Sequence, residues 1–497
     1  MPRTATREYD EDVVEYLNSA VSAFHCVAEV RARLLAGGFV ELDERKSWVG
    51  SVQAGGSYFI TRNGSSLLAF AVGGLFDAET SGAIVVGAHT DSPCPKLKPY
   101  SKLEKAGDTM MGVVGYGGGI WHSWFDRDLT LVGRALYATE GRVKHALVDL
   151  KKPICRIPTL AIHLSVGDER TTFKPNLQGH LPPMLASGIR RALSKGSEDG
   201  NGVGREDGGG ETGALARHDS AIVKLVADHL GCGPEDVLEL ELQLGDSQPS
   251  QLIGLHEEFV SSGRLDNLCS CFCGTTALLE AQPSLAADAS LRMLTMFDHE
   301  EVGSLSAQGA QSPAFKDVLE RCYAALAAST GGGDVKAFFA RSLQISSDMA
   351  HGVHPNYADR HDPNHGPKLQ GGLVIKHNAN QRYATNGVGA ALIREFAAIA
   401  DCPTQDFAVK ADSGCGTTIG PITAAGTGIR TIDVGPPQLS MHSCREMMGT
   451  DDVYYTIKTC IAAYEHYHTV SKAVDVDGPD AFWTNPGTGW ASAKLSC

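Results

Sequence analysis

The stretch LRMLTMFDHEEVGS, residues 291–304, decides the fold because a buried strand ends in it and a polar turn begins. Its first half, LRMLTMF, is a short apolar run of the kind that forms buried strands. Four consecutive ionisable side chains, from Asp298 to Glu301, follow directly. Ligands of α/β proteins collect at the carboxyl ends of strands, so this junction predicts a functional site.

Strand-like and helix-like segments alternate on both sides of this stretch. This alternation predicts an α/β catalytic domain with a mixed central sheet flanked by helices. The strand-like segments include GAIVVGA (82–88), SLQISSD (342–348), GGLVIK (371–376), DFAVKA (406–411) and GIRTIDVG (428–435); the helix-like ones include DNLCSCFCGTTALLEA (266–281), NGVGAALIREFAAIA (386–400) and a last helix from Asp451.

The first 95 residues add two local predictions. Apolar residues at helical spacing over 11–38 predict one amphipathic helix that ends at Gly37 and Gly38. The segment SYFITRNGSSLLAFAV (57–72) predicts a hairpin that turns at Asn63 and Gly64.

Residues 96–250 differ from the rest of the chain in the pattern of their strand-like and loop-like segments. LTLVGRALYA (129–138) and TLAIHLS (159–165) resemble strands separated by long loops, which favours a β-rich domain inserted into the catalytic one. We therefore expect the catalytic domain to comprise 1–95 and 251–497. The glycine-rich segment 195–213 has almost no apolar residue and is expected to be a mobile surface loop.

Composition narrows the function class. The 497 residues carry a formal net charge of −15, which disfavours nucleic acids and anionic membrane surfaces as partners. No run approaches the ~18 apolar residues of a membrane span, so we expect a cytoplasmic protein. The 13 cysteines show no recurrent spacing, which is typical of reduced thiols. Cys269, Cys271 and Cys273 are expected to pack in the core instead of binding metal.

Metal-binding side chains follow strand-like runs at five places. Histidine nitrogen with carboxylate oxygen, and without cysteine, suits catalytic zinc, manganese or cobalt. Two such ions about 3.5 to 4 Å apart need one bridging carboxylate and two further ligands each. The side chains at these five places can meet this requirement. Asp266 would bridge the two ions, His89 and Asp348 would bind one ion, and Glu301 and His442 would bind the other.

Two carboxylates near these ligands then have other uses. Glu300 is free to take a proton from the attacking water as the general base. Asp91, two residues after His89, can orient that imidazole through its other ring nitrogen.

Ordered motifs from about residue 10 to 470 resemble those of the aspartyl aminopeptidases, a family of dinuclear zinc exopeptidases of the cytosol. The motifs include AHTDSP, GRLDNL, SSDMAHGVHPNY, IKHNANQRYATN and PQLSMHSCREM. The resemblance implies a β-rich inserted domain that mediates assembly, a tetrahedral homododecamer, and removal of unblocked N-terminal aspartate or glutamate from peptides. It implies the same five ligands and the same base.

The resemblance also implies substrate contacts. These are His351, Lys376 and Tyr383, together with His163, which a neighbouring subunit lends to the site. Lys376 would supply the cation that an acidic first residue needs. His299, where relatives usually have asparagine, the ADSGCGTT segment (411–418) and the 195–213 insertion depart from the family pattern.

Two alternatives remain open. Related two-metal carboxypeptidases and deacylases share the His-x-Asp and Glu-Glu pieces but recognise a free carboxylate or an acyl group. A scaffold protein that assembles without catalysis is the other.

Overall fold

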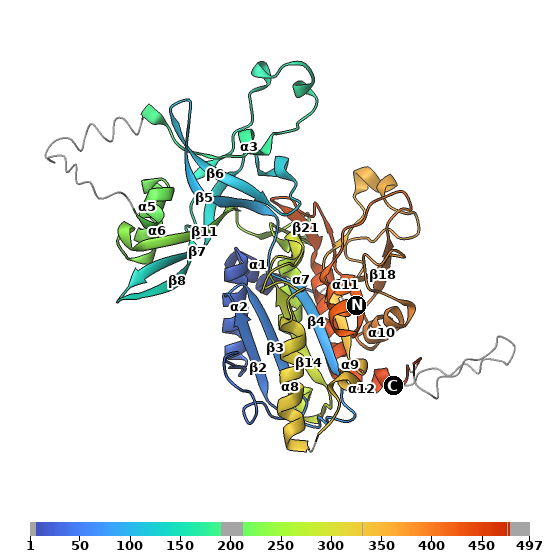
Figure 1. Cartoon of the computed structure of the whole chain (residues 1–497). Helices are drawn as coiled ribbons and strands as arrows, with labels where there is room; N and C mark the ends of the chain where they lie inside the picture. Colours follow the sequence, from blue (N-terminus) through green and yellow to red (C-terminus); the bar gives the residue numbers. More distant parts are fainter. Residues whose placement is uncertain (1–5, 190–211, 331, 475, 478–497) are drawn as a thin grey trace.

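The computed structural model describes residues 6–189, 212–330, 332–474 and 476–477. Its strands form a nine-stranded, a seven-stranded and a five-stranded sheet, and helices pack mainly against the first (Figure 1). The predicted α/β class with an additional β-rich region is confirmed.

The nine-stranded sheet is mixed. Four central strands run parallel because the chain crosses over between them. Their carboxyl ends therefore lie along one edge. The order is β1 (Val40–Glu41), β2 (Ser57–Arg62), β3 (Ser66–Val72), β14 (Leu291–Phe297), β4 (Ala83–His89), β15 (Leu343–Ser347), β19 (Arg430–Gly435), β17 (Leu373–His377) and β18 (Thr404–Ala408), with β14, β4, β15 and β19 as the parallel set.

Helices cover both faces of this sheet because successive side chains of a strand point to opposite sides. In β14, Leu294 and Met296 enter one core, and Met293 and Phe297 enter the other. The first core includes residues of α1 (Asp10–Ser19), α2 (Ala23–Ala36), α7 (Leu265–Glu280), α10 (Gly387–Ile399) and α12 (Thr450–Lys472), and the second those of α8 (Ala314–Thr330), α9 (Val335–Ala340) and α11 (Ile419–Thr427).

Local predictions in this region have mixed outcomes. The single helix expected over 11–38 is wrong, since the chain breaks after Ser19 and restarts at Ser22, whose hydroxyl accepts a bond from the His25 N–H. The hairpin is confirmed, with β2 and β3 antiparallel around Asn63 and Gly64. Cys269, Cys271 and Cys273 are free and buried in the core, as expected.

The seven-stranded sheet is antiparallel and has its own core (Figure 1, upper part). Because β11 also pairs with β7, the six strands from β11 to β7 in the sheet order close into a ring, and β8 extends from β7. The order is β11 (Val237–Asp246), β5 (Cys94–Lys105), β6 (Asp108–Tyr116), β10 (Met184–Ala186), β9 (Cys155–Arg156), β7 (Asp128–Thr139) and β8 (Arg142–Asp149), with helices α3 (Leu177–His180), α5 (Gly213–Arg217) and α6 (Ser220–Leu230).

The structure differs from one expectation for this region, and another falls mostly outside the described residues. TLAIHLS is not a strand, because 162–164 form a 3-10 turn without a strand partner and the apolar side chains of Leu160, Ile162 and Leu164 are exposed. Of the predicted mobile loop 195–213, residues 195–211 lie outside the described residues. Gly213 begins α5.

The five-stranded sheet was not predicted. It consists of β12 (Gln251–Ile253), β13 (Phe259–Ser262), β21 (Glu446–Gly449), β20 (Pro437–Leu439) and β16 (Ala350–His351), in that order. Asp266 follows β13, His442 lies between β20 and β21, and Asp348 precedes β16. This small sheet thus gathers three segments that carry predicted ligands. Among the described residues, no helix is both long and apolar enough to cross a membrane.

Candidate metal centre and active site

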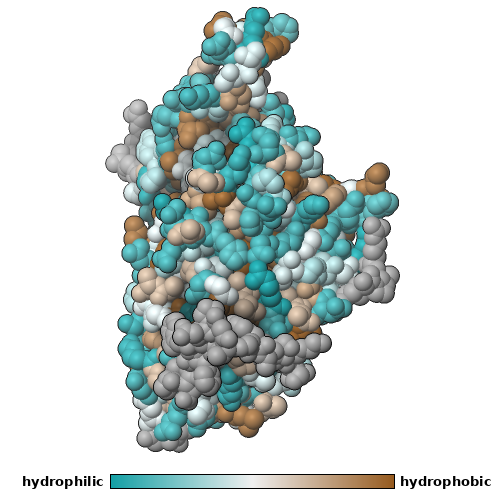
Figure 2. Space-filling view, turned by 90° about the vertical axis from the view of Figure 1, so that its right-hand side faces the viewer, coloured by the Kyte–Doolittle hydropathy of each residue, from teal (hydrophilic) through white to brown (hydrophobic). Residues whose placement is uncertain are grey.

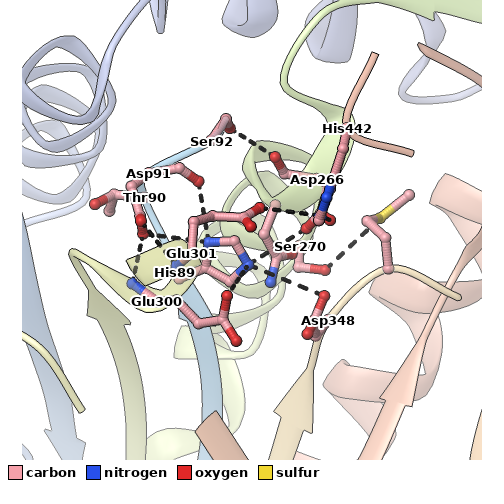
Figure 3. A network of polar contacts seen from close by, with 12 residues as sticks. His89, Thr90, Asp91, Ser92, Asp266, Ser270, Glu300, Glu301, Asp348 and His442 are labelled. Atoms are coloured by element: carbon pink, nitrogen blue, oxygen red, sulfur yellow. Dashed lines mark hydrogen bonds and ion pairs between the residues drawn. The ribbon is translucent and has the colours of Figure 1, made fainter. Parts of the chain in front are cut away.

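The predicted ligands converge at the carboxyl edge of the central sheet (Figure 3). His89 is the last residue of β4, and Asp348 directly follows β15. Glu300 and Glu301 come three and four residues after β14, which lies beside β4. The parallel register explains the convergence, because Phe297 of β14 pairs with His89 and so brings the two strand ends to the same level.

Asp266 lies between the two histidines. Its Oδ1 is 3.3 Å from His89 Nε2, and its Oδ2 is 3.3 Å from His442 Nε2 (Figure 3). The two oxygens of one carboxylate therefore face different imidazoles, as a carboxylate shared by two ions would. The side chain is buried at the start of α7.

The remaining ligands lie around these two histidines. Glu301 Oε1 is 3.3 Å from His442 Nε2, and Asp348 Oδ1 is 4.0 Å from His89 Nε2. The Glu300 carboxylate is 3.8 Å from His89 Nε2. Glu301 thus lies beside His442, whereas Glu300 and Asp348 lie at similar distances from His89, so the predicted assignment of ligands to two ions stays a prediction.

A turn after β14 brings both glutamates to this side. His299 has a left-handed backbone with φ of 63°, and a 3-10 turn over 300–302 follows. Histidine and asparagine adopt this conformation more readily than most residues. The His299 ring points elsewhere, since its Nδ1 lies 2.8 Å from the Ser306 hydroxyl. His299 therefore shapes the turn without contacting the metal cluster.

The carboxylate of Asp91 anchors this turn. It accepts the backbone N–H of Glu300 at 3.0 Å and that of Glu301 at 3.1 Å. Tyr116, which the sequence analysis missed, donates its hydroxyl to the same carboxylate at 2.7 Å. Burial opposes ionisation, but the neighbouring His89 imidazole and the hydrogen bonds from Tyr116 and the turn keep the pKa of Asp91 below its usual value.

Asp91 contacts His89 in two ways. His89 Nδ1 lies 3.0 Å from the main-chain carbonyl of Asp91 and 3.4 Å from its carboxylate. The shorter contact is within hydrogen-bond range and the longer one is just beyond it. The carbonyl therefore contributes to the orientation of the imidazole at least as much as the side chain.

Two more groups position the ligands and were also missed. The buried Glu446 accepts the backbone N–H of Asp266 at 3.0 Å and that of His442 at 2.7 Å. The carbonyl of Gly118 lies 3.0 Å from His442 Nδ1. Glu446 lies four residues after His442 within PQLSMHSCREM, which is the one signal in the sequence that could have suggested it.

The cluster concentrates negative charge in a buried place. Burial raises the pKa of Glu301 to about 7 and that of Asp348 to about 6. Burial and the neighbouring Asp348 and Glu301 raise the pKa of Glu300 well above its usual value, despite the opposing effect of His89. Burial alone would lower the pKa of His442, but Asp266 and Glu301 raise it to about 11. The site thus stabilises positive charge between these groups.

Divalent cations fit this arrangement. Asp266 Oδ1 and Glu301 Oε1 are buried and accept no hydrogen bond from the described residues. One ligand atom each of His89, Asp266 and Glu301 lie within 4.8 Å of one another. Buried carboxylate oxygens without a donor, each facing a histidine nitrogen, are typical of zinc ligands.

The predicted substrate contacts fall into two groups. Lys376 is 2% exposed, its ammonium lies 3.8 Å from Asp348 Oδ2, and it sits 5.4 Å from the centre of the Tyr383 ring. His351 belongs to β16, three residues after Asp348. His163 is different, because it lies on the exposed turn that protrudes from the seven-stranded sheet. Within one chain the structure does not bring His163 to the cluster.

Comparison with known proteins gives one matching family model, the aminopeptidase I zinc metalloprotease family (M18), over residues 16–464. The chain is 47% identical to a probable aspartyl aminopeptidase of Ricinus communis, with 94% of this chain and 97% of the relative covered. It is 41% identical to the aspartyl aminopeptidase of Aspergillus oryzae, with 94% of this chain and 97% of the relative covered.

Solved structures agree with this relationship. Ape4 in its cryo-EM complex with Nbr1 has a TM-score of 0.87 at 37% identity, with 95% of this chain and 88% of that chain covered. The mApe1 dodecamer of Saccharomyces cerevisiae has a TM-score of 0.81 at 28% identity, with 94% of this chain and 98% of that chain covered.

Proposed function

The chain belongs to the M18 family of aminopeptidase I zinc metalloproteases, and from this premise we propose that it removes unblocked aspartate or glutamate from the N-terminus of peptides. It is a hydrolase that uses zinc. The relatives named aspartyl aminopeptidase support the substrate class. One observation carries the specificity, namely the buried ammonium of Lys376 beside Asp348.

Five residues would hold two zinc ions, with manganese or cobalt as possible substitutes. His89 and Asp348 would bind one, His442 and Glu301 the other, and Asp266 both. When bound, zinc supplies a Lewis acid that polarises the peptide carbonyl and acidifies water.

The chain's own residues perform the remaining steps. Glu300 accepts a proton from the water that attacks the scissile carbonyl, and then passes it to the departing amine. Asp91 holds the turn that carries Glu300, and its carbonyl helps to orient His89.

A substrate panel tests this function. The kcat/KM for aspartyl anilide should exceed that for leucyl anilide by at least about tenfold, because an apolar side chain offers no carboxylate to the buried ammonium of Lys376. N-acetyl-aspartate should not be hydrolysed. Faster cleavage of the acetylated compound would favour the deacylase alternative, and no hydrolysis by zinc-loaded protein would favour the scaffold.

Replacing Lys376 by methionine tests the specificity directly. The variant keeps the volume of the stem but removes the charge, so kcat/KM for aspartyl anilide should fall about 10- to 100-fold, as for the loss of a charged hydrogen bond. The kcat/KM for leucyl anilide should change by less than about threefold. Equal losses on both substrates would contradict a specificity role. Lys336→Met on α9 is the matched control, since α9 packs on the opposite core.

We also propose that the chain forms a tetrahedral dodecamer. The related mApe1 forms a dodecamer, and the segment around His163 exposes Leu160 at 56%, Ile162 at 58% and Leu164 at 66%. The uppermost tip in Figure 2 shows hydrophobic residues, in brown, among hydrophilic ones, in teal. Residues 96–250 would then be the assembly domain, inserted between the catalytic parts 1–95 and 251–497. Assembly would bury this tip and let His163 reach a neighbouring active site.

A further inference from the structure

A cavity of about 300 Å³ adjoins the metal cluster and is lined by none of the proposed ligands. Residues of β16, β18 and β20 and of the segments that follow these strands line it. His351 and Met441, which precedes His442, lie on its wall. A peptide bound at the cluster can therefore continue into this cavity.

Three rings form one wall. The Phe407 ring lies 5.8 Å from that of His351 and 6.2 Å from that of His361, with interplanar angles of 66° and 67°. Such a wall offers an apolar surface with polar edges. It suits the aliphatic part of a side chain that ends in a polar group.

Unpaired polar groups lie at the same cavity. Gln438 is 1% exposed, and neither its amide nitrogen nor its amide oxygen has a hydrogen-bond partner among the described residues. His361 Nδ1 is likewise buried without a partner there. Buried polar groups are normally paired. A donor and an acceptor on one side-chain amide match the C=O and N–H of a peptide group.

The charge on the lining is positive. Arg360 and Lys410 line the cavity, and no aspartate or glutamate does. The acids next to lining residues along the chain are Asp359, Asp362 and Asp412. The Asp359 carboxylate is 3.8 Å from Arg360, and these two side chains are 80% and 78% exposed, so solvent screens the pair. Lys410 donates to the main-chain carbonyl of Asp359 at 3.2 Å, which leaves its charge uncompensated by that bond.

We propose that this cavity binds the second residue of the peptide substrate and prefers an acidic side chain there. The inference rests on the proposed function, since it concerns the same bound peptide. Gln438 pairs with the peptide group after the scissile bond, the rings pack on the aliphatic stem, and Arg360 and Lys410 attract the carboxylate.

Tripeptides that differ by one group test the proposal. Wild-type kcat/KM for Asp-Glu-Ala should exceed that for Asp-Gln-Ala about three- to tenfold, because glutamine has the same shape without the charge. A ratio near one, with Asp-Gln-Ala still cleaved faster than Leu-Gln-Ala, overturns this inference and leaves the proposed function intact. If Leu-Gln-Ala is cleaved as fast as Asp-Gln-Ala, the proposed function fails instead.

Variants locate the preference. In Arg360→Ala/Lys410→Ala the Glu-to-Gln ratio should fall to about one, whereas Lys336→Ala should keep the wild-type ratio. Gln438→Leu should raise KM about tenfold on both tripeptides and keep the ratio, with kcat retained. Its melting temperature should not fall, since the replaced amide has no partner to lose. A retained ratio in the double variant, or a lowered melting temperature with unchanged KM in Gln438→Leu, overturns the proposal.

Discussion

Glu300→Gln is expected to lower kcat on aspartyl anilide by about 10²- to 10⁴-fold while the zinc content of the protein stays at the wild-type value. Glutamine has nearly the shape of glutamate but cannot accept the proton from water. Glu300 is 3.8 Å from His89 and is not among the five proposed ligands. The negative charge that the substitution removes is therefore not needed to hold the ions. KM should change little, because substrate binding keeps its other contacts.

Metal analysis and steady-state kinetics of the same preparation check this result. Glu320→Gln on α8 is the control, since that glutamate pairs with Lys336 far from the cluster. Loss of zinc in Glu300→Gln would mean that the roles of Glu300 and Glu301 are exchanged. Full activity would remove Glu300 from the mechanism.

Asp266→Asn is expected to abolish both activity and tight zinc binding. The carboxylate faces His89 with one oxygen and His442 with the other, and the amide replaces one of these oxygens by a group that donates hydrogen and cannot bind metal. Loss of groups that only orient ligands weakens metal binding about 10- to 100-fold, so loss of the shared ligand should weaken it by more than about 100-fold.

Zinc titration with a competing chelator measures this loss, and circular dichroism shows that the fold is kept. The control is Asp401→Asn, because Asp401 is exposed and has a left-handed backbone, with φ of 52°, that asparagine tolerates well. A variant that retains two tightly bound ions would contradict the shared role of Asp266. Loss of one ion alone would assign Asp266 to a single site.

Sequence periodicity predicted most of the central sheet and its helices. β14, β4, β15 and β19 contain several apolar residues each and are buried over nearly their whole length, as expected for strands that are covered on both faces. A similar apolar run led to a wrong strand prediction for TLAIHLS, whose apolar residues lie on an exposed turn. A hydropathy pattern identifies side chains that are stabilised by apolar contacts. It does not distinguish contacts within the chain from contacts with another molecule.

The five-stranded sheet escaped prediction because its strands have two to four residues each. So short a run shows no periodicity, and its stability comes from partners distant in the sequence. The break between α1 and α2 was missed for a related reason, since apolar spacing continues through it while Ser22 restarts the helix.

The sequence by itself determined the chemical identity of the site. Histidines and carboxylates at the ends of apolar runs specify hard or borderline cations, and they do so before any fold is known. The turn after β14 was also implied, because two adjacent glutamates can serve one site only if the strand has ended.

Only the tertiary structure decided how these groups are held. The backbone N–H of Asp266 is fixed by Glu446, 180 residues further along the chain, and that of Glu300 by Asp91, 209 residues before it. The parallel pairing of β14 with β4 sets His89 level with the end of β14. Contacts between residues so far apart in the sequence depend on how the whole chain packs. Local sequence patterns therefore do not identify the hydrogen-bond partner of a buried polar group.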